Sequence, residues 1–146
     1  MIKSIYLFMI CLFLSCTAVQ QRVAIKECKF FLVSVRPYNF TFSSVKVDFD
    51  IKVDNPNSID ALLDKFVYTF YVNSMDVFSG TTGNAISIPA KQSKQFATTI
   101  TLEYNKIGQA LVEAMQLKTA AYRVEARAYI NTILGPVSYP VEIELE

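Results

Sequence analysis

The chain has 146 residues, and fourteen basic against thirteen acidic residues give it a formal net charge of +1. This length suits a single domain, and the charges form no clustered basic surface of the kind that nucleic-acid binding needs. The chain contains no histidine. Histidine-dependent nucleophile systems are therefore excluded, together with the commonest general base and metal ligand at neutral pH.

Residues 1–15 are predicted to be a lipoprotein signal peptide. Lys3 precedes an apolar run over residues 5–14, about half of the roughly 20 residues that a membrane-spanning helix needs. The sequence Phe13-Leu14-Ser15-Cys16 resembles a bacterial lipobox, although Phe13 stands where that pattern usually has Leu. The resemblance implies that Cys16 is acylated and becomes the mature N-terminus. Ordinary cleavage after Ala18 and a leader that is never removed are the alternatives.

Residues 16–27 are interpreted as a short tether without a regular pattern. Loss of Lys3 with the leader would leave thirteen residues of each sign and a net charge of zero. Two or three acyl chains on Cys16 would hold the protein on a membrane far more firmly than one chain can. Cys28 is expected to be a small buried residue at the start of a strand. If Cys16 is not modified, a Cys16–Cys28 disulfide becomes an alternative in an oxidising compartment.

Strand patterns begin at residues 28–35 and are clearest over residues 45–54. In the second segment apolar residues alternate strictly with lysine and aspartate, which is typical of a half-buried antiparallel strand. The segment stops at Asn55-Pro56-Asn57, because Pro56 removes a backbone donor and asparagine favours turns. We interpret these three residues as a structural turn, with a contact surface as the alternative.

Further strands are predicted at residues 65–72, 75–80, 86–88, 94–103 and 121–131, and a last strand follows Gly135-Pro136. Asn105 is expected to cap a single amphipathic helix that continues to Leu117. The predicted fold is all-β: a seven-stranded antiparallel sandwich of the immunoglobulin or fibronectin type III kind, with one short α-helix. This domain is assigned to residues 28–146.

A charged alternating strand that ends in Asn55-Pro56-Asn57 resembles the late-embryogenesis-abundant type 2 family, also known as the water-stress and hypersensitive-response domain. The order of the later elements fits as well: an aromatic strand, Ser79-Gly80, the segment 86–89, the strand 94–103, a helix and two strands. The resemblance implies a non-enzymatic sandwich linked to tolerance of drying, cold and other stress. It implies no catalytic residues.

Other chemistry is weakly supported by the residues. Asp48 and Asp50 share one strand face about 6.6 Å apart, but lysines flank them and a solvated charged face explains them. Calcium is a weak alternative that rests on the oxygens of Asp54, Asn57, Ser58 and Asp60. We expect no catalytic site, no cofactor and no metal.

Both faces of the aromatic segment 65–72 are apolar. A central strand under the helix explains this pattern, and a groove for an acyl chain or a partner strand is the alternative.

These observations predict a membrane-tethered β-sandwich lipoprotein in the cell envelope, facing the periplasm. The family resemblance implies a protective or interaction role under desiccation or cold. The expected partners are the membrane, through an N-terminal lipid anchor, and protein clients or lipid, but not nucleic acid. A lipid- or hydrophobic-ligand-binding module and a structural subunit of an envelope assembly are the alternatives.

Overall fold

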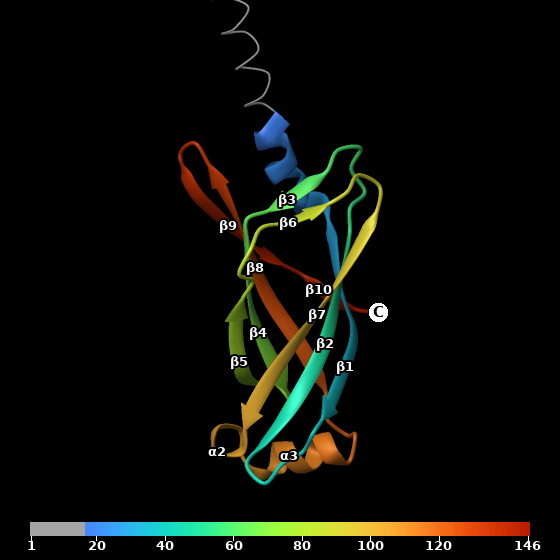
Figure 1. The fold of residues 1–146 in the computed structure, drawn as a ribbon, viewed down its shortest axis with the longest axis vertical. Coiled ribbons are helices and arrows are strands. Elements are labelled where there is room, and N and C mark those ends of the chain that lie inside the picture. Colours follow the sequence, from blue (N-terminus) through green and yellow to red (C-terminus); the bar gives the residue numbers. More distant parts are fainter. Residues whose placement is uncertain (1–16) are drawn as a thin grey trace, which may run out of the picture.

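The computed structural model describes residues 17–146, so Cys16 and the predicted leader lie outside the described residues. Within residues 17–146, two four-stranded sheets face each other and a two-stranded sheet lies at one end (Figure 1). The expected all-β sandwich is confirmed, but residues 17–146 contain ten strands where we expected seven, because short segments such as β3 and β10 also pair. The first sheet has the order β10-β1-β2-β7, with bounds Ile143–Leu145, Lys29–Tyr38, Ser44–Asp54 and Ser93–Glu103. The second has the order β5-β4-β8-β9, with bounds Met75–Thr81, Lys65–Val72, Tyr122–Thr132 and Gly135–Val141. The small sheet pairs β3 (Ala61–Leu63) with β6 (Ile86–Ile88).

The alternation in β2 is confirmed by the burial of its side chains. Every apolar residue from Val45 to Val53 is buried, and the intervening charged residues are partly or fully exposed. β2 is hydrogen-bonded on both edges, to β1 and to β7, and both pairings are antiparallel. One face of a central strand therefore supplies the core of the first sheet, and the other face meets solvent.

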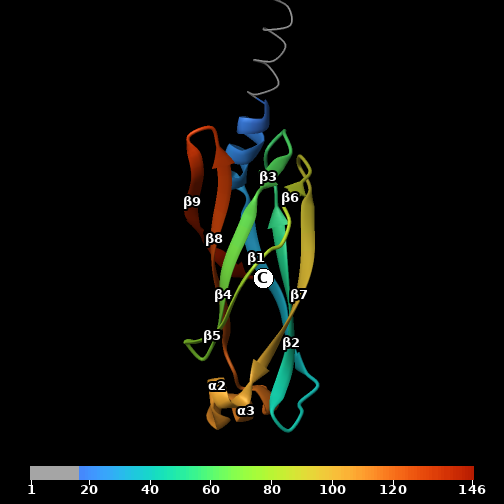
Figure 2. The same cartoon turned by 60° about the vertical axis from the view of Figure 1, so that its left-hand side comes forward.

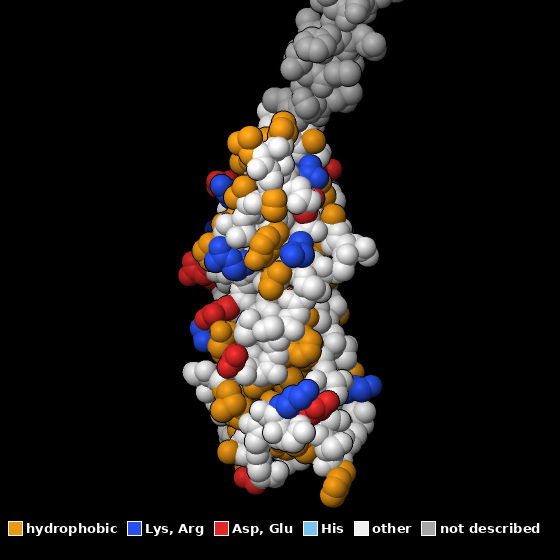
Figure 3. Space-filling model, turned by 90° about the vertical axis from the view of Figure 1, so that its left-hand side faces the viewer, with side chains coloured by type: hydrophobic (Ala, Val, Ile, Leu, Met, Phe, Trp, Pro, Cys, Tyr) orange, Lys and Arg blue, Asp and Glu red, His pale blue; other side chains and the backbone are white. Residues whose placement is uncertain are grey.

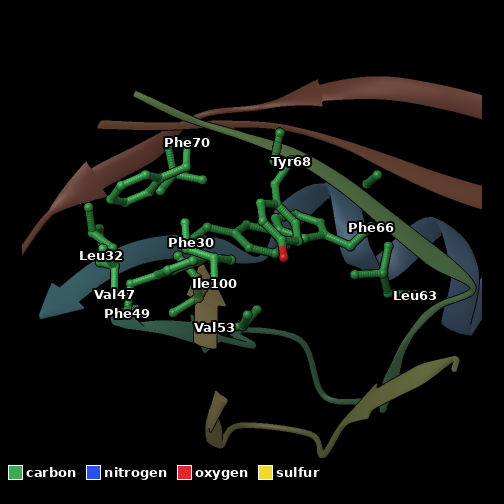
Figure 4. Close-up of a cluster of buried hydrophobic side chains, with 14 of the residues drawn as sticks. Phe30, Leu32, Val47, Phe49, Val53, Leu63, Phe66, Tyr68, Phe70 and Ile100 are labelled. Atoms are coloured by element: carbon green, nitrogen blue, oxygen red, sulfur yellow. The ribbon is translucent and has the colours of Figure 1, made fainter. Parts of the chain in front are cut away.

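Aromatic rings from the two sheets meet in the core between them (Figure 4). Phe30 stacks on Phe66 with ring centroids 5.6 Å apart, and Phe49 stacks on Phe70 at 5.2 Å. Tyr68 meets Phe49 edge to face at 5.6 Å. Such pairs contribute roughly 0.5–1.5 kcal/mol each beyond the area that they bury. The inward face of β4 is therefore occupied by the partner sheet.

The C-terminal segment differs from the single last strand that we expected. β9 pairs with β8 in the second sheet, whereas β10 crosses to the first sheet and pairs in parallel with β1. Only Glu142 separates the two strands. The apolar alternation continues through this residue, so the pattern does not reveal the change of sheet.

The expected single helix is two helices, α2 (Tyr104–Ile107) and α3 (Gln109–Gln116). Gly108 separates them with φ +85°, a conformation that favours glycine. Asn105 lies inside α2 and is not its N-cap, which is Glu103. Both helices close one end of the sandwich, as Figures 1 and 2 show. β4 is a central strand as expected, but the helices do not cover its outer face.

The segment before β1 is more regular than the predicted tether. Residues 17–24 are helical, and a 3-10 helix, η1 (Ile25–Glu27), follows them. Ala24 and Ile25 are buried against the sandwich. Packing on the core, which no local pattern indicates, stabilises this helix at the end of the molecule opposite α3 (Figure 2).

Candidate functional site

The candidate site is the end of the sandwich on which the N-terminal helix lies, which we call the tether end. It comprises the helix of residues 17–24, η1, the β3–β6 sheet, the Asn55-Pro56-Asn57 turn and the tip of the β8–β9 hairpin (Figures 1 and 2). These elements are far apart in the sequence. Side-chain hydrogen bonds centred on the turn and on the helix join them into one unit.

Asn55 is the only polar residue buried within residues 17–146. Its Nδ2 donates to the backbone oxygens of Ile88 at 2.9 Å, Ile59 at 3.0 Å and Pro89 at 3.2 Å. Its Oδ1 accepts from Asn57, from the backbone N–H at 3.0 Å and from Nδ2 at 2.8 Å. The Asn55 amide thus forms hydrogen bonds with the backbone of two separate loops. Both its nitrogen and its oxygen have partners, as a buried polar side chain requires.

Asn57 carries this network to the N-terminal helix. Its Nδ2 also donates to the backbone oxygen of Ala24 at 2.9 Å, and its own backbone oxygen accepts from Lys91 N–H at 3.0 Å. The Lys91 ammonium in turn donates to the Pro56 oxygen at 2.6 Å. The turn that ends β2 therefore also holds the helix and the β6–β7 loop.

An ion pair fixes the same helix from another side. The Arg22 guanidinium donates from Nε and Nη2 to the two carboxylate oxygens of Asp64, at 2.8 and 3.0 Å. Asp64 also accepts from the backbone N–H of Asn131 at 2.8 Å. Burial opposes ionisation of Asp64, but the hydrogen bonds from Arg22 and Asn131 outweigh it and hold its pKa below the ordinary value. Through the bond from Asn131 to Asp64, the pair joins the helix to β8. Arg22 and Asp64 were not among the predicted sites, because partners 42 positions apart leave no signal in one sequence.

A shallow crevice of about 300 Å³ lies beside η1, lined by Lys26, Cys28, Tyr139 and Glu142 among others. Cys28 is buried, as expected, and its Sγ donates to the Ala24 oxygen at 3.7 Å. Burial, with the nearby charges of Asp54 and Glu27, raises the pKa of this thiol to about 11. Cys28 is therefore protonated at neutral pH and is a poor nucleophile.

The carboxylates considered from the sequence serve separate structural roles. Asp48 accepts from Thr99 Oγ1 at 2.7 Å, and Asp50 accepts from Ser34 Oγ at 2.7 Å. Asp54 accepts from Ser93 Oγ at 2.5 Å, and Asp60 from the backbone N–H of Ala90 at 2.9 Å. Among residues 17–146, no group of three or more histidine, cysteine, aspartate or glutamate side chains could hold a metal ion.

Cys16, the predicted lipidation site, lies outside the described residues. In the part of the chain that the structure describes, no helix has both the length and the apolar character that crossing a bilayer requires.

The outer face of β4 is partly polar. Val67 and Tyr71 are half-buried there, and the Tyr71 hydroxyl donates to Glu125 Oε2 at 3.1 Å. Arg123 lies over the Tyr71 ring, with its guanidinium carbon 4.3 Å from the ring centroid. The neighbouring depression, about 350 Å³, is lined by Val67 together with Glu125 and Arg127.

The end opposite the tether end presents an aromatic loop between β1 and β2. Phe40 and Phe42 in the loop, and Tyr38 at the end of β1, are all exposed, and Phe42 fully so. Hydrogen bonds from the Thr41 hydroxyl to the Ser44 oxygen and from the Ser44 N–H to Thr41 Oγ1, both at 3.0 Å, order this loop. Aromatic side chains held in solvent are typical of contact surfaces. The alternation of aromatic and polar residues over positions 38–42, which was not among the predicted sites, is the signal in the sequence that could have indicated this loop.

Comparison with known proteins identifies the fold and the family. Residues 50–145 match the family model described as late embryogenesis abundant protein, LEA_2. No curated protein matches the chain significantly in sequence. The solution structure of an Arabidopsis thaliana protein aligns with a TM-score of 0.55 at 16% identity, over 80% of this chain and 82% of that one. A solution structure described as a late embryogenesis abundant (LEA) protein aligns with a TM-score of 0.51 at 16% identity, over 78% and 66%.

Proposed function

Because the chain belongs to the late embryogenesis abundant family of the LEA_2 type, we propose that it is a non-enzymatic stress protein of the cell envelope. In this proposal acylated Cys16 tethers the sandwich to a bacterial membrane, on the periplasmic side. There the domain protects or contacts other proteins during drying or cold. The family match, which spans residues 50–145, carries the proposal.

The geometry of the tether end supports the anchoring part of this proposal. The helix that begins the described chain at Thr17 directly follows Cys16 in the sequence. Arg22 binds Asp64, and the Ala24 oxygen binds Asn57. A lipid on Cys16 would therefore be connected to the sandwich through a docked helix and not through a flexible linker.

The aromatic loop supports the contact role. It lies at the end of the sandwich farthest from the tether end, where an anchored molecule would meet proteins in the envelope (Figure 1). Aromatic side chains contribute large apolar area at a small cost in conformational entropy. Exposed Phe40 and Phe42 are therefore the side chains that we expect to touch partially unfolded clients.

The anchor is tested by mass spectrometry of the full-length protein extracted from its own membrane. We expect an acylated N-terminal Cys16, and we expect Cys16→Ala to move the protein into the soluble fraction. Cys28→Ala is the matched control, since it removes a cysteine from the sandwich and leaves the lipobox intact. An unmodified Cys16 in membrane-bound protein contradicts the lipoprotein assignment. In the same native spectra, a bound lipid that leaves only on unfolding would favour the ligand-binding alternative.

The protective role is tested with a labile enzyme taken through freezing or drying. The protein should preserve more activity than an unrelated β-sandwich of equal size at the same concentration. Phe40→Ser with Phe42→Ser should remove most of the benefit, because both side chains are exposed and their loss leaves the core intact. Equal protection by the unrelated sandwich would contradict the proposal.

A further inference from the structure

The β8–β9 hairpin ends in an apolar tip at the tether end. Thr132 pairs with Gly135, so Ile133 and Leu134 are the two residues of the turn. They are 88% and 100% exposed. Such turns are normally built from asparagine, aspartate or glycine. Here Gly135 alone takes the positive φ, +117°, and two branched aliphatic side chains extend into the surroundings.

Charge is absent from the whole outer part of this hairpin. Residues 128–141 contain no lysine, arginine, aspartate or glutamate, although 18% of the chain is charged. The hairpin also carries half-buried Tyr129 on β8 and exposed Val137 on β9, whereas the hydroxyl of Tyr139 is buried in the sandwich. Tyrosine prefers the boundary between water and lipid, and charged side chains are strongly disfavoured in the apolar layer. This composition suits contact with a bilayer better than contact with water.

The hairpin tip reaches the level of the N-terminal helix in both ribbon views (Figures 1 and 2). Val19 and Val23, four residues apart on one face of that helix, are 40% and 49% exposed. In Figure 3 hydrophobic side chains lie at this end of the molecule, as they do along the rest of the same face. The sequence just before the helix is the apolar run 5–14 followed by Ser15-Cys16. The exposed apolar side chains therefore lie at the end of the domain where the sequence continues into the predicted lipidation site.

We propose that Ile133 and Leu134 insert into the interfacial region of the lipid bilayer to which the chain is tethered, with Val19 and Val23 resting on its surface. This inference rests on the tethering in the proposed function. It makes the tether end a second membrane contact that sets the orientation of the domain. The sandwich stands end-on, and the aromatic loop is held at the far end.

Two aliphatic side chains are too few to bind a membrane by themselves. Each one that leaves water raises the ratio of docked to undocked protein by roughly tenfold. In an anchored chain two such side chains are enough for docking, because the tether keeps the hairpin tip at a high effective concentration beside the lipid. Docking should therefore occur in the anchored protein and be lost when the anchor is removed.

The chain contains no tryptophan, so one introduced tryptophan reports its own surroundings. Leu134→Trp places it at the tip, and Phe42→Trp places the matched control in the aromatic loop; both positions are fully exposed, so folding is not disturbed. The full-length variants, purified from membranes, are reconstituted into vesicles of phosphatidylethanolamine and phosphatidylglycerol, with and without brominated acyl chains. On vesicles, the emission of Leu134→Trp should shift to shorter wavelength than that of tryptophan in water, and bromine should quench it. The emission of Phe42→Trp should be neither shifted nor quenched.

Flotation of the same vesicles separates this inference from the proposed anchor. Protein that floats while Leu134→Trp still emits as in water overturns the docking and leaves the anchor intact. A shift without bromine quenching overturns it in favour of contact with a second copy. Cys16→Ala protein that floats and is quenched through Leu134→Trp supports the docking and contradicts the anchor. Cys16→Ala protein that stays in solution, with its emission unshifted, supports the anchor, and it supports the docking where the protein with Cys16 intact is shifted and quenched.

Discussion

Replacement of Asn55 by alanine should destabilise the sandwich by about 3 kcal/mol. The Ile88 oxygen is buried, and loss of its donor costs roughly 1–3 kcal/mol. The bonds to Ile59, Pro89 and Asn57 are partly buried, so water replaces part of each, and they add about 0.5 kcal/mol apiece. Urea unfolding of protein that begins at Thr17, followed by circular dichroism, measures the change. For a domain of this size the midpoint should fall by about 2 M with little change in slope.

Two further variants separate the network from the amino-acid type. Asn105→Ala removes an exposed asparagine from α2 and should change stability by less than about 0.5 kcal/mol. Asn55→Asp keeps an acceptor for Asn57 but turns a carboxylate toward the Ile88 oxygen, so it should cost at least as much as alanine. If Asn55→Ala costs less than about 1 kcal/mol, the hydrogen bonds of this side chain do not hold the tether end, and the reasoning is wrong.

Three other predictions address the helix, an edge strand and the thiol. Because the pKa of Asp64 is lowered in the folded protein, its bond to Arg22 contributes stability that is complete above the ordinary pKa of 3.8 and is lost as pH falls through the lower folded pKa. The difference in unfolding free energy between wild type and Asp64→Asn should therefore be constant near neutrality and shrink only below about pH 4. Urea titrations at several pH values measure this difference. Gly80→Ala should cost about 1–3 kcal/mol in thermal or urea unfolding, because its added Cβ would lie 2.6 Å from the Tyr68 hydroxyl; no loss would show that the ring moves freely. Cys28 should resist iodoacetamide at pH 8 and react only as the protein unfolds, since its thiol pKa is about 11; rapid labelling of native protein, measured by mass, would contradict its burial.

The strands that a local pattern determines were predictable. The alternation from Val45 to Val53 gives the buried face of β2, because one side of a half-buried strand must be apolar along its whole length. The inward residues of β8 follow from the same rule. These two strands indicate half-buried antiparallel sheet, and the further strands predicted along the chain are what indicate a sandwich.

Features that depend on distant contacts were not predictable. Nothing between Val141 and Ile143 signals that the chain changes sheets, since Glu142 is as suitable for a continuing strand as for a crossing. Gly108 could have indicated the break between α2 and α3, because glycine within a helical pattern costs stability there. The helical spacing around it outweighed this signal in our prediction.

The tether end shows most clearly that contacts between residues distant in the sequence could not be predicted. Asn55 and Asn57 were recognised as turn residues, but the reach of Asn57 to Ala24 spans 33 positions. Val19 and Val23 of the helix of residues 17–24 are exposed, and the helix is stabilised by burial of Ala24 and Ile25. The uncharged stretch 128–141 was readable in the sequence. Only the fold shows that its tip lies beside that helix.

The course of β1 has a mechanical consequence. This strand, ten residues long, runs from the tether end directly to the aromatic loop and is flanked by β2 and β10. Tension between an anchored membrane and a client held at the loop would pass along one backbone of about 33 Å that is already extended. Its hydrogen bonds to β2 lie across the pull, with one shift of register between Leu32 and Ser34. The first strand of the sandwich thus connects the two ends of the domain through one extended backbone.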